Sequence, residues 1–162
     1  MYDDQRGFSL IELLIVVSII LIILAIALPN FLRSRMAANQ ASALQSMRII
    51  GTAEVGYSTT YGGTFSTSLA ALGPPASGQQ PSSTAADLLD EVLASGAKSG
   101  YTFTYTPGMF NAATNTWNGY TLLGNPAAYG QSGSTYFYAD QTFLIRANNT
   151  TTAGATDSAV GD

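Results

Sequence analysis

The stretch GFSLIELLIVVSIILIILAIALPNF, from Gly7 to Phe31, decides how this chain folds. It contains one carboxylate, Glu12, and no further charged residue follows before Arg33. As a helix, residues Phe8 to Leu28 would span about 31 Å, close to the hydrocarbon thickness of a bilayer. We expect a membrane-spanning helix here, because a helix satisfies its own backbone hydrogen bonds in lipid.

Three interpretations of this apolar run compete. A cleaved secretory signal needs a basic start and a small-residue cleavage site, whereas this chain begins MYDDQRG and the run continues into PNFLRSRMAANQ. A plain single-pass anchor explains the length but gives Glu12 no purpose. The third interpretation makes Glu12 functional, because an unpaired charge in a membrane helix costs roughly 2.5–3.5 kcal/mol even on a lenient scale.

The rest of the chain has the composition of a soluble domain rich in Gly, Ser, Thr and Tyr. Residues 62–162 carry six acidic and two basic side chains, so this head is poorly suited to grip the phosphates of nucleic acid. The chain has no Cys and no His, which removes thiolate metal sites and the commonest general base. We find no nucleotide-binding or hydrolase motif and expect no enzyme activity, cofactor or metal. Asp87, Asp90 and Glu91 could hold a hard cation, but an exposed helix face is the simpler interpretation.

The block Gly7-Phe8-Ser9-Leu10-Ile11-Glu12 resembles the processing motif of type IV pilins and pseudopilins. In that family a Gly ends a short polar leader and Glu is the fifth residue of the mature chain. Counted from Phe8, Glu12 is the fifth, and Pro29 also falls where family members commonly have a proline. The resemblance covers residues 1–60. It implies an α+β fold, the pilin α/β roll, in which a long N-terminal helix packs against a small antiparallel sheet.

The resemblance also implies how the chain is processed. A membrane-embedded prepilin peptidase would cut between Gly7 and Phe8 and methylate the new amino group of Phe8. The precursor would cross the inner membrane once, with its head outside. The positive-inside rule gives the opposite orientation, because Arg33 and Arg35 follow the apolar run. We adopt the orientation of the family.

Cleavage would give Glu12 a partner. It creates an α-amine at Phe8 that is cationic at neutral pH, and in a filament of packed helices Glu12 could pair with the Phe8 amine of a neighbouring copy. A missing partner costs several kcal/mol, so the pair would penalise a wrong axial register. The alternative is that Glu12 only reaches toward the membrane interface. Phe8, Glu12 and Pro29 are therefore the expected assembly residues.

Pro29 removes the hydrogen bond to the carbonyl of Ala25. We expect a kink there rather than the end of the helix, because helix-favouring sequence resumes at once. The stem helix should end near Tyr61, before Gly62-Gly63. Its second half should cover the head with an apolar stripe at spacings of four and three. That stripe is Ala37, Ala41, Leu44 and Met47.

The head follows the stem. The segment TAADLLDEVLASG, residues 84–96, predicts a short amphipathic helix with Asp87 in its first turn. Period-2 runs at 100–107, 119–125, 135–141 and 143–148 predict a three- or four-stranded antiparallel sheet, mostly a meander. The excursion at 107–119 holds the sole Trp and is either a contact loop or a loop that packs its own aromatic rings. The apolar face of the short helix comprises Leu88, Leu89, Val92 and Leu93.

Six segments are therefore expected along the chain. They are a cleaved leader (1–7), a transmembrane and filament-core helix (8–29), an amphipathic stem helix (30–61), a connecting region with a short helix (62–99), an antiparallel sheet (100–148) and a loosely ordered tail (149–162).

The resemblance favours a structural subunit of a type IV pilus, a homopolymer exported to the cell surface by an inner-membrane platform and its ATPase. Pili of this family serve adhesion, twitching motility and DNA uptake. The first alternative is a pseudopilin of a type II secretion system. Related major pseudopilins carry a calcium site built from carboxylates in the sheet region, and here the expected sheet offers only Asp140. The second alternative is a monomeric, membrane-tethered binding domain.

Overall fold

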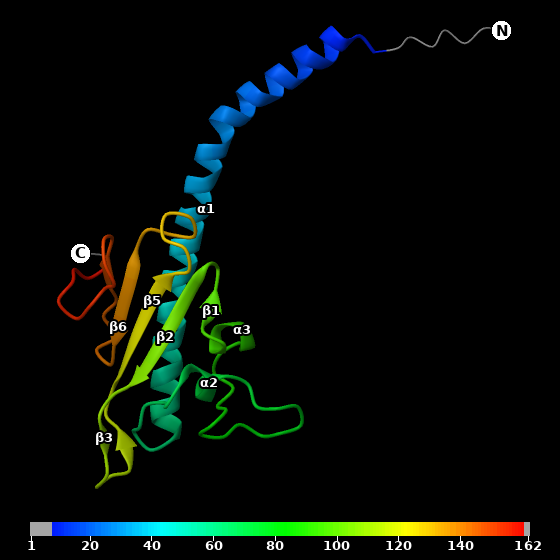
Figure 1. Cartoon of the computed structure of the whole chain (residues 1–162). Coiled ribbons are helices and arrows are strands. Elements are labelled where there is room, and N and C mark those ends of the chain that lie inside the picture. The colour runs from blue at the N-terminus through cyan, green and yellow to red at the C-terminus, as the bar shows by residue number, and fades with distance from the viewer. Residues whose placement is uncertain (1–7, 161–162) are drawn as a thin grey trace. The chain divides into compact units, whose positions relative to one another are not determined.

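The structure is a computed structural model that describes residues 8–160 (Figure 1). The predicted leader, residues 1–7, and the last two residues of the predicted tail lie outside the described residues. The chain forms two compact units, which meet in sequence between Arg35 and Met36. Each is described by itself below.

One helix, α1 (Leu10–Thr60), contributes to both units. The predicted long N-terminal helix is therefore confirmed. The helix does not end at Pro29, which lies inside it. Just after the proline, the Asn30 side-chain amide donates to the carbonyl of Ile26 at 3.3 Å. The predicted kink at Pro29 stays a prediction.

The predicted stop at Gly62-Gly63 is confirmed. Both glycines have left-handed backbone conformations, with φ of 78° and 81°, which glycine adopts without steric cost. The N–H of Gly63 donates to the carbonyl of Ser58 at 2.8 Å. This bond is the long-range closure of a Schellman motif, and it satisfies a carbonyl that the end of the helix would leave unpaired.

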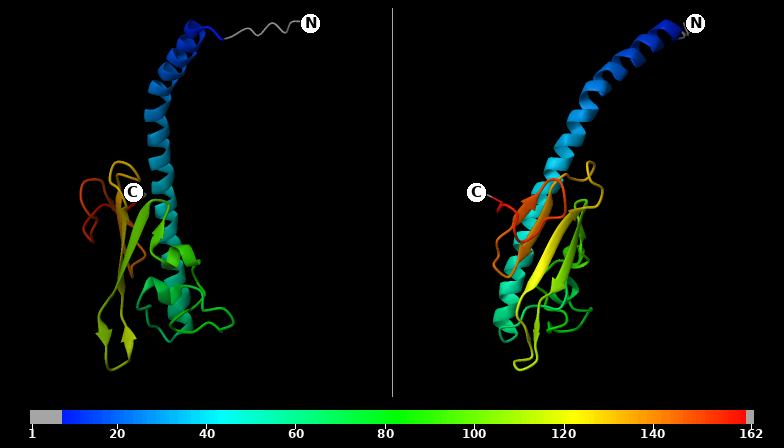
Figure 2. Two further views of the ribbon diagram at one scale, coloured as in Figure 1. Left: turned by 45° about the vertical axis from the view of Figure 1, so that its right-hand side comes forward. Right: turned by 60° about the vertical axis from the view of Figure 1, so that its left-hand side comes forward.

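The second unit contains a five-stranded antiparallel sheet in the order β1-β2-β5-β6-β7. Figures 1 and 2 show this sheet as a layer against the second half of α1. A separate two-stranded hairpin, β3-β4, occupies the excursion between β2 and β5. Two one-turn helices, α2 (Leu69–Leu72) and α3 (Glu91–Ala94), lie in the connecting region. The strands are β1 (Ala97–Lys98), β2 (Tyr101–Pro107), β3 (Phe110–Asn111), β4 (Thr116–Trp117), β5 (Tyr120–Pro126), β6 (Tyr136–Asp140) and β7 (Arg146–Asn148).

The predicted meander is confirmed, with two differences at its edges. The sheet gains a fifth strand, because a turn at Ser99 and Gly100 brings Lys98 opposite Tyr101. The strand predicted at 143–148 begins only at Arg146. Phe143 has a left-handed φ of 62° and donates its N–H to the carbonyl of Asp140 at 3.0 Å. The turn after β6 is therefore longer than the pattern of apolar residues indicates.

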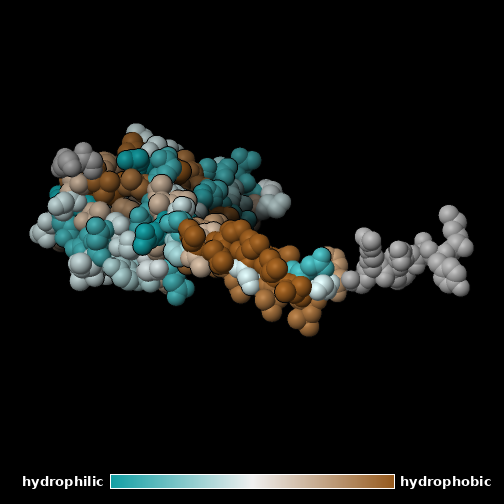
Figure 3. All heavy atoms as spheres, turned by 90° about the horizontal axis from the view of Figure 1, so that it is seen from above, coloured by the Kyte–Doolittle hydropathy of each residue, from teal (hydrophilic) through white to brown (hydrophobic). Residues whose placement is uncertain are grey.

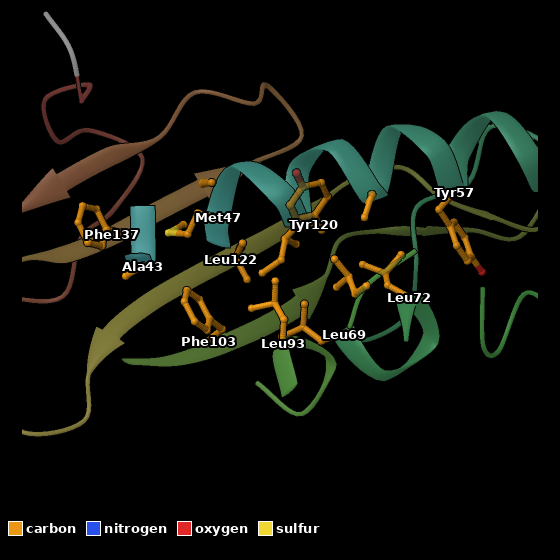
Figure 4. Packing of buried hydrophobic residues seen from close by; sticks show 14 of the residues in the cluster. Ala43, Met47, Tyr57, Leu69, Leu72, Leu93, Phe103, Tyr120, Leu122 and Phe137 are labelled. Carbon is orange, nitrogen blue, oxygen red and sulfur yellow. The ribbon is translucent and has the colours of Figure 1, made fainter. Parts of the chain in front are cut away.

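The core lies between the sheet and the second half of α1. Along β2, the side chains alternate between buried and exposed as predicted, with Tyr101 and Phe103 facing inward. Figure 4 shows Met47 of α1 and Leu122 of β5 in this core. The connecting region closes it with four buried leucines, Leu69, Leu72, Leu89 and Leu93.

The predicted apolar stripe of the stem was wrong in its first half. Ala37 and Ala41 are exposed, and only Met47 of that stripe is fully buried. An alanine removes little apolar area from water, so it does not determine which face turns inward. The large side chains do, and the observed stripe keeps the helical period on a different face. It runs through Ala43, Met47, Ile50, Ala53 and Tyr57.

The short helix predicted over residues 84–96 is reduced to the single turn of α3. Asp87 is not in a first helical turn, because it has a left-handed φ of 58°. Instead the segment before α3 pairs with the C-terminal end of α2. The N–H groups of Leu88 and Leu89 both donate to the carbonyl of Leu72, at 2.8 and 2.9 Å. These longer-range backbone bonds replace the local bonds of a helix.

The tail also differs from the prediction of loose order. Within the described part, residues 149–160 fold back onto β7. The N–H of Val160 donates to the carbonyl of Ile145, and the N–H of Ala147 donates to that of Ser158, at 2.8 and 3.0 Å. Ala153 is buried. Side chains add to these contacts, since Arg146 donates to the carbonyl of Asp157 at 2.7 Å and the Asn148 amide donates to its carboxylate at 3.0 Å. The low-complexity composition gives no periodic pattern from which such contacts could be predicted.

Sequence reasoning missed a buried acid in the stem. Glu54 is 0% exposed and lies on the inward face of α1. Its carboxylate accepts the N–H of Ser66 at 3.1 Å and also the Ser66 hydroxyl. The Tyr105 hydroxyl of β2 donates to the carbonyl of the same serine at 3.0 Å. Glu54 thus fastens α1 to the loop after it, and through that loop to the sheet.

Two tyrosines complete the surroundings of this acid. The rings of Tyr105 and Tyr120 stack with centroids 5.3 Å apart. Burial, and then the nearby Glu54 carboxylate, raises the pKa of both phenols far above its ordinary value. Both phenols therefore stay neutral, and Tyr105 remains a hydrogen-bond donor over the whole physiological range.

We predict that Glu54→Leu destabilises the head. The change leaves the buried N–H of Ser66 without its acceptor and leaves the Ser66 hydroxyl only its longer bond to the carbonyl of Ser68 at 3.2 Å, so the free energy of unfolding should fall by about 1–3 kcal/mol. Glu54→Gln keeps one acceptor and should cost less. Urea unfolding of the full chain in detergent micelles, followed by the fluorescence of Trp117, measures this. The exposed Glu91→Leu is the control, and equal losses from both leucine variants would contradict the role of Glu54.

Candidate assembly site

The first half of α1 exposes an apolar surface on all sides. Between Phe8 and Leu32 nearly every large apolar side chain is exposed, and Phe8 itself is 84% exposed. Figure 3 shows these side chains as a continuous hydrophobic surface. The helix is long and apolar enough to cross a membrane. An exposed apolar surface of this extent requires lipid or another protein surface to cover it.

Glu12 lies at the start of this surface and already has a partner in its own chain. The N–H of Ser9 donates to Glu12 Oε2 at 2.9 Å. The carbonyl of Ser9 accepts the N–H of Leu13 at 3.2 Å. Ser9 is therefore the N-cap of α1, and Glu12 supplies the returning hydrogen bond of a capping box. The sequence signal for it is the Ser-x-x-Glu pattern of residues 9–12, before an apolar run.

This arrangement leaves Glu12 able to bind more. The carboxylate is exposed and lies in the first turn of α1. Two carboxylate oxygens can accept about four hydrogen bonds, and one is made here. The acid can therefore receive a donor from another molecule. Its predicted pairing with the Phe8 amine of a neighbour stays a prediction.

The other predicted site residues lie along the same segment. Phe8 precedes α1, which begins at Leu10, and its side chain is exposed. Gly7 lies outside the described residues. Pro29 is exposed on α1. The structure therefore brings Glu12 next to Ser9, which was not predicted, and leaves the roles of Phe8 and Pro29 in assembly as predictions.

The possible cation site in the head has another explanation. Asp90 is the N-cap of α3, and its carboxylate accepts the N–H of Leu93 at 2.8 Å. Its second oxygen forms an ion pair with Lys98 at 3.1 Å. The Leu93 amide and then Lys98 lower the pKa of Asp90. Within residues 8–160, no three His, Cys, Asp or Glu side chains lie where they could hold a metal ion together.

Asp140, the acid of the predicted sheet, is occupied in a similar way. It accepts the N–H of Thr142 at 2.9 Å and the Thr142 hydroxyl at 2.6 Å. The Tyr138 hydroxyl donates to its second oxygen at 3.3 Å. Asp140 therefore holds the turn after β6.

Comparison with known proteins points to the N-terminal segment. Residues 3–28 match the family model for the prokaryotic N-terminal methylation motif. The type IV major pilin protein PilA of Myxococcus xanthus (strain DK1622) is 46% identical over 50 residues. That alignment covers 31% of this chain and 23% of PilA, so the similarity spans about a quarter of this relative's length. No solved structure matches the chain.

We predict that the Ser9 amide is protected from hydrogen exchange by Glu12. In detergent micelles, Glu12→Leu should speed its exchange about tenfold or more, because a hydrogen bond to a charged group contributes about 1.5–3 kcal/mol. Glu12→Gln should have a smaller effect. Amide exchange of the full chain, followed by NMR, measures this, with Leu13 as the internal reference. An unchanged Ser9 rate in Glu12→Leu would contradict the capping role.

Proposed function

Because the chain carries the N-terminal segment of the type IV pilin and pseudopilin family, we propose that it is a structural subunit of a type IV pilus. One observation carries the proposal. A folded head and an entirely exposed apolar helix belong to the same chain, and the methylation motif lies at the start of that helix. Lipid covers this helix before assembly, and other copies of it cover it in the filament.

In this proposal a prepilin peptidase cuts between Gly7 and Phe8 and methylates Phe8. The matched methylation motif, residues 3–28, includes both residues. The exposure of Phe8 ahead of α1 supports its access to an enzyme. The precursor crosses the inner membrane once, with its head outside, and ATP-driven machinery moves the assembled filament to the cell surface.

Glu12 then selects the register of the filament. Before assembly, the Ser9 amide is a neutral partner for the carboxylate. The amine of Phe8 on a neighbouring copy is a stronger one, because it adds the attraction of an opposite full charge to the hydrogen bond, and that attraction is large in an apolar surrounding. A copy inserted one step out of register leaves both charges unmatched in an apolar surrounding, which costs several kcal/mol. Pro29 contributes by loosening α1 so that neighbouring helices can pack.

A type II secretion pseudopilin shares the same N-terminal segment, so the choice rests on the head. The matching relative is named a major pilin. Asp140 is held by Thr142 and Tyr138, and no acidic cluster surrounds it among the described residues. Both points favour the pilus. Adhesion, twitching motility and DNA uptake are the roles that such a filament would serve.

We predict that filaments sheared from producing cells contain this chain in its processed form. Electron microscopy should show long fibres, because the exposed helices associate laterally to leave water. Sequencing and intact mass of the fibre protein should show loss of residues 1–7 and one added methyl group on Phe8. Loss of enzyme secretion on deletion, with surface fibres intact and free of this chain, would instead identify a pseudopilin.

We predict that Glu12→Leu blocks assembly but not processing. The unpaired amine of a neighbouring Phe8 costs about 3–5 kcal/mol, so fibre yield should fall by more than about tenfold. The protein should stay in the membrane in its cleaved form. Ser18→Leu is the matched control, since Ser18 lies on the same exposed helix and bonds only to the carbonyl of Leu14. Normal yield and normal subunit spacing in Glu12→Leu fibres would refute the pairing.

A further inference from the structure

The segment from Asp87 to Leu93 exposes half of the apolar face that the sequence predicts there. Leu89 and Leu93 enter the core, but Leu88 is 39% and Val92 is 57% exposed. Two carboxylates, Asp87 and Glu91, are exposed beside them in sequence. We call these four residues the acidic patch: Asp87, Leu88, Glu91 and Val92.

The backbone holds the acidic patch in place. The N–H of Asp87 donates to the carbonyl of Gly73 at 2.9 Å, and the N–H groups that follow are bound to Leu72. Asp90 caps the turn that carries Glu91 and Val92. Leu88 and Ile49 of α1 line a groove of about 430 Å³. The patch is therefore a preformed surface and loses little conformational freedom when a partner binds.

The charges of the patch have no counterpart nearby. Among residues 8–160, the ion pair in the chain is Lys98–Asp90, and neither Asp87 nor Glu91 takes part in one. Arg48 lines the same groove without pairing with either acid. A partner that matches this surface presents apolar side chains together with a cation, placed on the side away from Arg48.

The chain itself offers such a surface on α1. Phe31, Leu32 and Arg35 are exposed, and at 3.6 residues per turn they share one face of the helix. Arg33 projects from the opposite face. Neither arginine forms an ion pair within the described residues. We call Phe31, Leu32 and Arg35 the basic patch.

We propose that the acidic patch of one copy binds the basic patch of the next copy, with Arg35 beside Asp87 and Glu91. This inference rests on the proposed function, since it concerns contacts within the filament. The two surfaces match in apolar character and oppose in charge. They are different surfaces of one chain, so the contact is heterologous, and a heterologous contact that does not close into a ring propagates into an open filament.

Charge exchange tests the contact. We predict that Arg35→Glu and Glu91→Arg each lower fibre yield about tenfold, because like charges across an interface are strongly unfavourable. The double variant restores the opposite-charge pair and should return yield to within about twofold of the wild type. Arg33→Glu is the matched control: it changes the same charge on the opposite helix face, and Glu91→Arg should not rescue it. Failure of Glu91→Arg to rescue Arg35→Glu would overturn the contact.

Disulfide trapping gives a second readout that does not depend on charge. The chain has no native cysteine, so Leu32→Cys and Val92→Cys can be introduced together. Oxidised fibres should yield a ladder of linked multimers from the double variant, and no ladder from either single variant or from Leu32→Cys with Gln79→Cys. If the wild type forms fibres but the oxidised double variant gives no ladder, the contact is wrong and the proposed function still stands. Absence of wild-type fibres would overturn the proposed function and the contact with it.

Discussion

The exposed apolar surface of the first half of α1 is the constraint on which the rest of this protein depends. Its large apolar side chains are exposed, so it requires lipid or another protein surface to cover it. Glu12 is the acid on this surface, and it marks the N-terminal end of α1. Its carboxylate is tolerated at the helix start because the Ser9 amide and the helix dipole favour it there, and it remains open to a cation from outside.

The second half of α1 has a different role, because it holds the sheet and the connecting region on the helix. Large apolar side chains on one face form the core with the sheet. Glu54, buried on the same face, ties the helix to Ser66 and through Tyr105 to β2. A head fixed in this way can present a rigid acidic patch. The proposed contact with Arg35 of another copy requires that rigidity.

The elements with a long or strict period were predictable from the sequence. The helix through Pro29, its stop at Gly62-Gly63 and the alternation along β2 all depend on local backbone and side-chain preferences. The predictions for residues 84–96 and for the tail differ from the structure because backbone groups there bond to distant residues instead of near neighbours. Leu88 and Leu89 bond to Leu72 instead of forming a helix, and Val160 returns to Ile145 in a tail whose composition carries no pattern.

The sequence by itself determined that the chain has an apolar helix with one acid near its start, a helical stem and an antiparallel sheet. Hydrophobic period, helix-stopping glycines and charge placement act between near neighbours, so they can be read along the chain. Only the tertiary structure decided which face of the stem is buried, that Glu54 is an internal acid, and that Leu88 and Val92 lie outside the core. Those outcomes depend on how large side chains pack and on which polar groups form hydrogen bonds. Both depend on contacts between residues that are far apart in the sequence.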